Sequence, residues 1–242
     1  MKTTKLLIWG VSVLMCLYLV YAWVPILQRR LSAQNAVPVP TMRPPPFTYV
    51  RRLEVADLAT GRTASATVTM AWDGSRLLRQ EQRGNILTHT RIIVPNGTMD
   101  EVAQTASRSA AGLPPLQHSR PYNSDRIGFY ASDDCIFHSP TERLERMEEI
   151  TIGNDRYQTA VVTAKDYPNH VEWRLPALGC VRVKYAATDK TDDGHSSTST
   201  EETVSLTLGR DAAQNALFSS FENLKRVAAP VKGEEFVAAF GH

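Results

Sequence analysis

The chain lacks an excess of charge of either sign. Among its 242 residues, 27 lysines and arginines stand against 25 aspartates and glutamates, and both kinds are spread along the sequence. A protein that binds nucleic acid gathers basic residues on one surface, where they neutralise phosphates. Because the sequence shows no such cluster, we predict that nucleic acid is not a partner.

Recognisable catalytic and cofactor motifs are also missing. The glycines stand at expected hairpin turns, whereas loops that bind phosphates or dinucleotides gather them in front of a helix. Acidic doublets such as Glu148-Glu149 would point to opposite sides of a strand and would not converge on a cation. The candidate bases of a hydrolase sit in no known motif: His89, His118, His138, His170, His195 and His242. We therefore predict no cofactor, no metal and no enzymatic activity.

Cysteine is scarce, and its three positions limit what it can do. Cys16 lies in an apolar run near the N-terminus, which leaves Cys135 and Cys180 as a pair in the rest of the chain. Their spacing is not the CxxC of a redox or zinc site. The pair permits one disulfide in an oxidising compartment, and the alternative is two buried thiols that pack as small apolar side chains. We predict the disulfide.

One long apolar run is present. Leu6 to Leu27 contains 22 residues without a charge and would be roughly 33 Å long as a helix, enough to cross a bilayer core. The alternative is a cleaved signal peptide, whose apolar region is about 7 to 15 residues and ends at a small-x-small site. This run is longer, and the best cleavage candidate after it is poor. We predict an N-terminal anchor over residues 1–30 with a transmembrane helix at 6–27.

Proline marks the end of the anchor region. Five prolines between Ala36 and Phe47 exclude a helix and favour an extended chain, so residues 31–46 are predicted to be a linker. Residues 47–228 are predicted to form one domain, and residues 229–242 are predicted to be a tail.

Alternation of apolar and polar residues dominates the predicted domain. Turn signals such as Asp73-Gly74 and Asn96-Gly97 interrupt it about every ten residues, which is typical of an antiparallel meander. The predicted strands are 48–57, 62–72, 75–83, 86–94, 149–153, 156–165, 170–175, 181–187 and 202–209. Short helices are predicted around 133–147 and at 212–219, an excursion with at most a short helix at 106–134, and a polar hairpin tip at 188–200. The fold class is mainly β (α+β), with short helices covering one antiparallel sheet.

Apolar strand residues form the candidate ligand-binding surface. A meander with one apolar face must cover that face with a helix, a second sheet or a ligand. The residues predicted to line a concavity are Leu53, Val55, Val68, Met70, Leu77, Ile92, Val161, Trp173, Leu175, Val183, Leu206 and Leu208. Ile136-Phe137 and Leu217-Phe218 are the predicted lid segments. The alternative is that these side chains pack against one another and leave no cavity.

Two parts of the sequence resemble a known family. Ala66 to Val102, with its RxxRxE stretch at Arg76 to Glu81 between turn dipeptides, resembles the opening of periplasmic LolA/LolB-like domains, the lipoprotein-localisation-factor-like family. Val171 to Tyr185 and Thr203 to Val227 are similar to the closing part of related exported proteins. The resemblance implies a half-barrel whose curved sheet holds apolar ligands such as acyl chains beneath helical lids. The predicted anchor and disulfide depart from the soluble carriers of this family.

Two functional hypotheses follow. The first is a periplasmic binding module for an apolar or lipid-like ligand or a lipoprotein segment, held in the bacterial inner membrane by a single span. The second is a structural or regulatory protein whose filled core presents its edges to an envelope protein partner. Charges flanking the apolar run nearly balance, so the orientation rests on the cysteine pair. A ligand site needs roughly several hundred cubic ångströms of mostly apolar space, whereas a packed core has almost none.

Overall fold

The computed structural model describes residues 41–84, 87–93, 97–121, 129–136, 141–190 and 196–231. The predicted anchor at 6–27 and most of the predicted linker lie outside these residues, as do Phe137 and most of the predicted tail. Within the described ranges, no helix is both long and apolar enough to span a bilayer.

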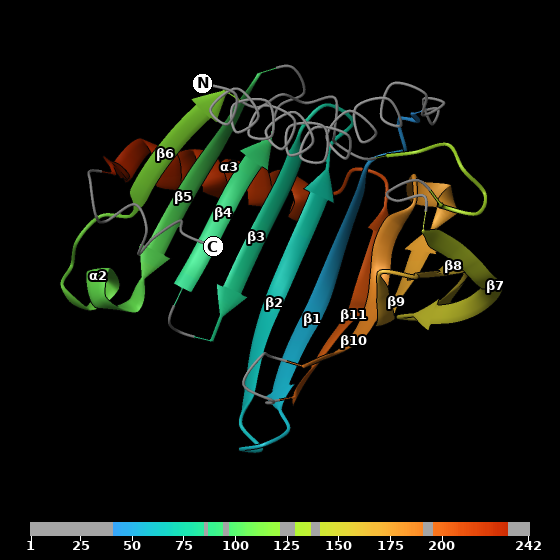
Figure 1. Cartoon of the computed structure of the whole chain (residues 1–242). Coiled ribbons are helices and arrows are strands. Elements are labelled where there is room, and N and C mark those ends of the chain that lie inside the picture. The colour runs from blue at the N-terminus through green and yellow to red at the C-terminus, as the bar shows by residue number, and fades with distance from the viewer. Residues whose placement is uncertain are drawn as a thin grey trace, which may run out of the picture. The chain divides into compact units, whose positions relative to one another are not determined.

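One curved antiparallel sheet of twelve strands dominates the described residues (Figure 1). The strands are β1 (Phe47–Asp57), β2 (Thr63–Trp72), β3 (Leu77–Arg83), β4 (Leu87–Ile93), β5 (Thr98–Thr105), β6 (Leu116–Pro121), β7 (Glu142–Ile152), β8 (Asp155–Ala164), β9 (Tyr167–Leu175), β10 (Val181–Lys190), β11 (Ser196–Leu208) and β12 (Ala229–Pro230). Their order in the sheet is β12-β6-β5-β4-β3-β2-β1-β11-β10-β9-β8-β7, and only β12 and β6 pair in parallel. The pairing of β1 with β11 joins two meanders into one unclosed sheet.

The hairpin turns follow the chemistry predicted from the sequence. At the Asp73-Gly74 turn, the Asp73 carboxylate accepts hydrogen bonds from the backbone N–H groups of Ser75 and Arg76 at 2.8 and 2.6 Å. These bonds close the turn locally, as aspartate side chains commonly do. The antiparallel pairing of β1 with β2, β2 with β3 and β3 with β4 confirms the predicted hairpins of the first four strands.

The prediction of a helix around 133–147 is wrong. Residues Glu142–Ile152 form β7, which pairs along its whole length with β8. The charged sequence of this segment resembles an exposed helix, but strand pairing overrides local preference at a sheet edge. The excursion at 106–134 contains β6 as well as the short helix α2 (Ala106–Ala110), and the strands β10 and β11 extend into the predicted polar tip.

The helix α3 (Ala212–Val227) covers one face of β2 to β5, which we term the outer face (Figure 1). Phe218 and Phe221 are buried there in a cluster with Ala71, Leu78, Ile92 and Val102. The sequence predicted that this helix ends at Ser219. It continues to Val227 because Phe221 prolongs the apolar stripe that packs on the sheet.

Cys135 and Cys180 form a disulfide, which confirms the predicted pairing. The bond ties residues 129–136 to the start of β10, and the backbone N–H of Tyr130 donates to the carbonyl of Gly179 at 3.0 Å. Phe129 of this segment enters the main core, where its ring centroid lies 5.0 Å from that of Trp72 and 5.8 Å from that of Phe47.

Candidate functional site

The face of β1 to β6 opposite α3 is the inner face, and strand register arranges its side chains in rows. Tyr49 on β1 lies opposite Met70 on β2, Met70 lies opposite Arg79 on β3, and Arg79 lies opposite Arg91 on β4. The adjacent row consists of Arg51, Val68, Glu81 and His89. Residues directly opposite on neighbouring strands share one face of a sheet. A band of charged side chains therefore crosses the inner face.

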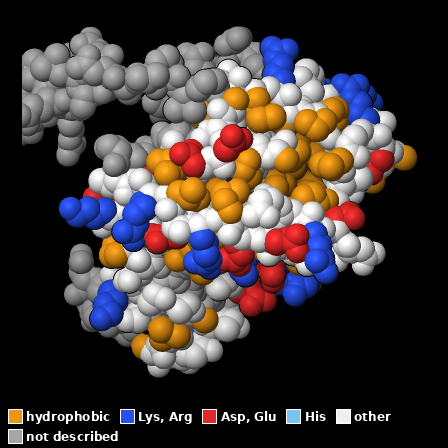
Figure 2. Space-filling model, turned by 90° about the vertical axis from the view of Figure 1, so that its right-hand side faces the viewer, with side chains coloured by type: hydrophobic (Ala, Val, Ile, Leu, Met, Phe, Trp, Pro, Cys, Tyr) orange, Lys and Arg blue, Asp and Glu red, His pale blue; other side chains and the backbone are white. Residues whose placement is uncertain are grey.

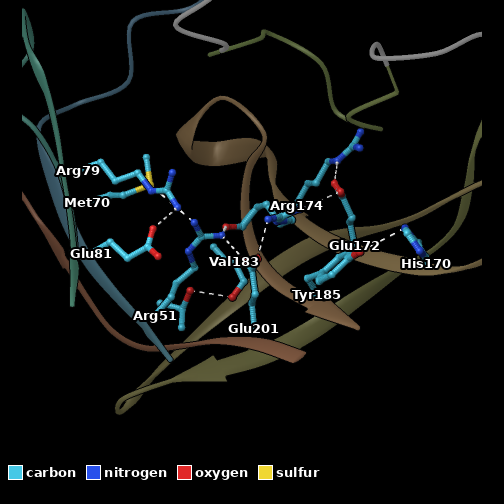
Figure 3. Close-up of polar contacts among 12 residues, drawn as sticks. Arg51, Met70, Arg79, Glu81, His170, Glu172, Arg174, Val183, Tyr185 and Glu201 are labelled. Atoms are coloured by element: carbon cyan, nitrogen blue, oxygen red, sulfur yellow. Dashed lines mark hydrogen bonds and ion pairs between the residues drawn. The ribbon is translucent and has the colours of Figure 1, made fainter. Parts of the chain in front are cut away.

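An alternating series of ion pairs continues this band across β11, β10, β9 and β7 (Figure 3). In order, the members of this ion-pair chain are Arg51, Glu201, Arg182, Glu172, Arg174 and Glu142. The successive nitrogen-to-oxygen distances are 2.6, 2.8, 3.2, 2.7 and 2.8 Å. Glu201 and Glu172 each contact two arginines, and the chain contains as many carboxylates as guanidinium groups.

The ion-pair chain is most deeply buried at its two ends. The side chain of Arg51 is 8% exposed, and those of Arg174 and Glu142 are each 5% exposed. Burial alone would raise the pKa of Glu172, but Arg174 and Arg182 hold that pKa below its ordinary value. Burial alone would lower the pKa of Arg174, but its pairs with Glu142 and Glu172 raise it. Glu172 and Arg174 thus keep their charges because the neighbouring members carry the opposite charge.

A hollow of about 290 Å³ lies beside the ion-pair chain, and we term it the inner hollow. It is bordered on one side by β1 to β3 and on the other by β9 and β10, since the sheet curves around it. Its apolar lining consists of Tyr49, Met70, Leu77, Phe129 and Val181. Its charged lining consists of Arg51, Glu172, Arg174 and Arg182. This arrangement can hold an apolar group next to an ionic one.

Met70 is held in place at the inner hollow by two neighbours. The hydroxyl of Tyr49 donates to the Met70 sulfur at 2.8 Å, and Arg51 Nη2 lies 3.8 Å from the same sulfur. The Arg51 guanidinium also lies 5.4 Å from the centre of the Tyr49 ring. Burial is the main cause that raises the pKa of Tyr49, so this hydroxyl remains a hydrogen-bond donor.

A second hollow, of about 250 Å³, shares Glu172 and Arg174 with the inner hollow and includes His170 in its lining. The His170 Nε2 atom lies 2.6 Å from an Asp189 carboxylate oxygen, and Nδ1 lies 3.2 Å from the Tyr185 hydroxyl. The sequence contains no motif that predicts this group. Tyr185 and Asp189 share one side of β10 by period-two spacing, but the register of β9 with β10 is what brings His170 to them.

The residues predicted to line one concavity are divided among several places. Leu77, Val161, Trp173, Leu175 and Val183 are buried in the main core, and Met70 and Leu206 pack against it. Ile92 lies on the outer face under α3, and the sequence analysis did not separate the two faces. Val68 is fully buried, Leu53 is half-buried, and Val55 and Leu208 are 44% and 53% exposed. Of this set, Met70 and Leu77 line the inner hollow.

The predicted lid segments also have different positions. Leu217 and Phe218 belong to α3 on the outer face, away from the inner hollow, while Ile136 lies in no helix. The described residues contain no group of three or more His, Cys, Asp or Glu side chains that could hold a metal ion. His89, which the sequence placed in a strand, lies in β4 and is 3.2 Å from Glu101 on β5.

Among known proteins, this chain is similar to several solved structures. No protein-family model matches the chain. No curated protein matches it either. The LolA superfamily protein NE2245 from Nitrosomonas europaea is 13% identical, with a TM-score of 0.30, over 75% of this chain and 93% of that one. A domain described as an outer membrane lipoprotein-sorting protein from Vibrio parahaemolyticus is 11% identical, with a TM-score of 0.31, over 75% and 92%.

A third structure, that of PNGF-II, is 11% identical with a TM-score of 0.37 and covers 79% of this chain, which spans 32% of that one. The LolA-like resemblance noted in the sequence thus also occurs among solved structures. At these identities and TM-scores, no statement about ligand or activity follows from it.

Proposed function

We propose that this protein is a membrane-anchored, periplasmic binding module that holds an apolar or lipid-like ligand, or the lipidated segment of a lipoprotein, in the inner hollow. A single N-terminal span at 6–27 would hold it in the bacterial inner membrane. The proposal concerns binding and includes no catalytic step.

The observation that carries the proposal is the mixed lining of the inner hollow. Tyr49, Met70 and Phe129 present aromatic rings and a thioether, which are side chains that adapt to apolar ligands of irregular shape. Arg51 and Arg174 lie at the same hollow and are buried. Small-molecule sites commonly combine an apolar lining with placed polar groups. The inner hollow has both kinds of group in similar share, which suits a ligand with an apolar and a polar part.

Two further features support the proposed location. The disulfide between Cys135 and Cys180 is stable in an oxidising space such as the periplasm and is rare in the cytoplasm. The uncharged run from Leu6 to Leu27 is long enough to span a bilayer. A reporter fused after Val227 should be active only outside the cytoplasm, and activity restricted to the cytoplasm would reverse the proposed orientation.

Native mass spectrometry with lipid extraction tests the ligand. The full chain, purified in an uncharged detergent, should carry a bound lipid-like species that is released on unfolding. Met70→Trp places a bulky ring in the inner hollow and should abolish the bound species. Leu58→Trp is the matched control, because Leu58 is 57% exposed at a turn remote from the hollow. A bare mass for the unmodified chain would contradict the proposal.

A second candidate is a non-enzymatic envelope protein that acts through protein contacts. The observation that favours it is that most of the predicted apolar residues fill the core rather than line a cavity. The edge strand β7 would not serve such contacts by strand addition. Its exposed side carries ion pairs such as Arg143 with Glu145 and Arg146 with Glu148, and Figure 2 shows charges of both signs mixed over this side of the molecule. Charged edges disfavour pairing with a further strand.

A further inference from the structure

We propose that the ligand of the inner hollow is an amphiphile with an anionic head group, a phosphate or a carboxylate, and that Arg79 and Arg91 bind this head. The inference rests on the proposed function and specifies its ligand class. It follows from the inner face of β3 to β6, which carries more positive than negative charges, whereas the ion-pair chain carries equal numbers of both.

The inner face of β3 to β6 carries more cations than anions. Four arginines share this face with two glutamates: Arg79, Arg83, Arg91 and Arg120, with Glu81 and Glu101. Both glutamates are already engaged by neighbours. Glu81 lies 2.6 Å from Arg83 and 3.1 Å from Arg79, and Glu101 lies 3.2 Å from His89. This region, which we term the cationic half, therefore has a positive charge that its own carboxylates do not cancel.

Arg79 and Arg91 are direct cross-strand neighbours in this half. Like charges directly opposite each other destabilise a sheet. Burial and the charge of Arg91 lower the pKa of Arg79, which is the electrostatic sign of the same repulsion. On its other side Arg91 lies opposite Glu101 of β5 and helps to lower the pKa of that carboxyl, but within the described residues its guanidinium forms no direct ion pair or hydrogen bond. An anion placed between these two side chains would remove the repulsion.

Donor groups beside the hollow point to the same conclusion. Arg51 is 7% exposed, and its Nε–H has no hydrogen-bond partner among the described residues. The Nε–H of Arg79 is also buried without a partner in this part of the chain. A buried donor without a partner costs free energy, and a ligand oxygen that accepts from it recovers that cost. Arginine suits this role because its planar group can bind carboxylate or phosphate oxygens in pairs.

The position of these arginines explains why the anion would belong to an amphiphile. Arg79 lies directly opposite Met70 (Figure 3). Met70 lines the inner hollow together with Leu77 and Phe129. The hollow of about 290 Å³ is at the small end of ligand sites, so it suits a head group and the start of a chain. A ligand that lies across both regions would contact apolar side chains and cations at once.

Binding of matched probes to the full chain in an uncharged detergent tests the inference. One probe is a single-chain acylglycerol phosphate, the second is the uncharged monoacylglycerol with the same chain, and the third is inorganic phosphate. The phosphorylated amphiphile should bind at least about tenfold more tightly than its uncharged partner, because each charge-assisted contact is worth more than about 1.4 kcal/mol. Arg79→Gln combined with Arg91→Gln should remove this difference. The control Arg52→Gln, on the opposite side of β1, should keep it.

Each other outcome rejects a defined part of the proposal. Equal binding of the two amphiphiles would overturn the anionic head but keep the apolar-ligand function. Binding of neither would overturn both. Binding of inorganic phosphate as tightly as the amphiphile would show a free-anion site and overturn the lipid assignment. Loss of the preference in Arg52→Gln would show a diffuse charge effect and overturn the role of Arg79 and Arg91.

A folding control accompanies the double variant. Near-ultraviolet circular dichroism of Arg79→Gln/Arg91→Gln should match that of the unmodified chain. If the double variant does not fold, Arg91→Gln alone replaces it, because within the described residues Arg91 forms no direct ion pair or hydrogen bond and acts on Glu101 only through its charge. An unchanged phosphate preference in a folded Arg91→Gln protein would overturn the inference.

Discussion

The band of charged side chains that crosses the sheet has two halves, the ion-pair chain and the cationic half, which use the same residue types in different proportions. In the ion-pair chain, three arginines alternate with three glutamates from β1 across to β7. In the cationic half, on β3 to β6, two arginines lie opposite each other and the carboxylates are too few. In the first arrangement each charge has an opposite neighbour, so removal of one member leaves buried charge without its full complement. In the second arrangement two like charges lie opposite each other, which costs stability unless a ligand supplies negative charge. The comparison separates arginines that serve the fold from arginines that are available for binding.

The largest expected effect comes from breaking the ion-pair chain. Arg174→Ala should lower the free energy of unfolding by about 3 to 5 kcal/mol, because it removes the guanidinium that pairs with the buried Glu142 and leaves Glu172 with Arg182 as its remaining arginine. Urea denaturation measures this change. Arg143→Ala, whose side chain is 74% exposed, is the control and should cost less than about 1 kcal/mol. Equal costs for the two variants would show that the ion-pair chain does not stabilise the fold.

The next effect concerns the close approach of Gly179 to Phe129, a residue of the main core. Gly179 has φ 74°, and a Cβ atom there would lie 2.7 Å from the Cβ of Phe129. Gly179→Ala should therefore cost about 2 to 3 kcal/mol, from the backbone conformation and the displaced ring together. Gly153→Ala is the matched control, since Gly153 has φ 63° and nothing within 4 Å of its would-be Cβ. Thermal unfolding should show a clearly larger loss of stability for Gly179→Ala than for Gly153→Ala. Equal losses would show that the contact with Phe129 does not contribute.

Acid should destabilise the ion-pair chain over a pH range that follows from the lowered pKa of Glu172. The pKa of Glu172 is lowered in the folded protein, so its stabilising charge is fully present above its ordinary value, about 4.3, and is lost as the pH falls through the folded value. The free energy of unfolding should therefore fall below about pH 4. Denaturation at several pH values measures it. Glu172→Gln should show a shallower decline, and an identical decline would assign the acid sensitivity to other carboxylates such as Glu81.

The smallest effect is expected for Arg91. Arg91→Gln should change the free energy of unfolding by less than about 0.5 kcal/mol, because the repulsion from Arg79 that it removes offsets the attraction to Glu101 that it loses. Urea denaturation of this variant beside Arg174→Ala compares an arginine of the cationic half with an arginine of the ion-pair chain. A loss comparable to that of Arg174→Ala would mean that Arg91 stabilises the fold and would remove the distinction between the halves.

Local features of the sequence predicted much of the sheet. The turn chemistry at Asp73-Gly74 and the alternation on either side of it defined hairpins whose partners are adjacent in the sequence. The pairing of Cys135 with Cys180 followed from the number of cysteines and the expected compartment. These predictions succeeded because each depends on neighbouring residues or on a single pair.

The predictions of a helix around 133–147 and of a helix end at Ser219 were wrong for one physical reason. Local propensity describes an isolated segment, whereas β7 is fixed by pairing with β8, and α3 is prolonged by Phe221 packing on the outer face. The same limit applies to the predicted ligand surface. Ile92 and Leu77 were placed in one set, although β3–β4 register puts Ile92 on the opposite face from Leu77.

By itself, the sequence determined a mainly β domain of consecutive hairpins, the cysteine pair and an apolar N-terminal run. Only the tertiary structure decided that β1 pairs with β11, which brings Arg51 to Glu201 across 150 positions of sequence and starts the ion-pair chain. It also decided that Arg79 lies directly opposite Arg91 on the inner face. The physical reason is that a strand's alternation defines its two faces, but the sheet's long-range register defines which residues meet on them.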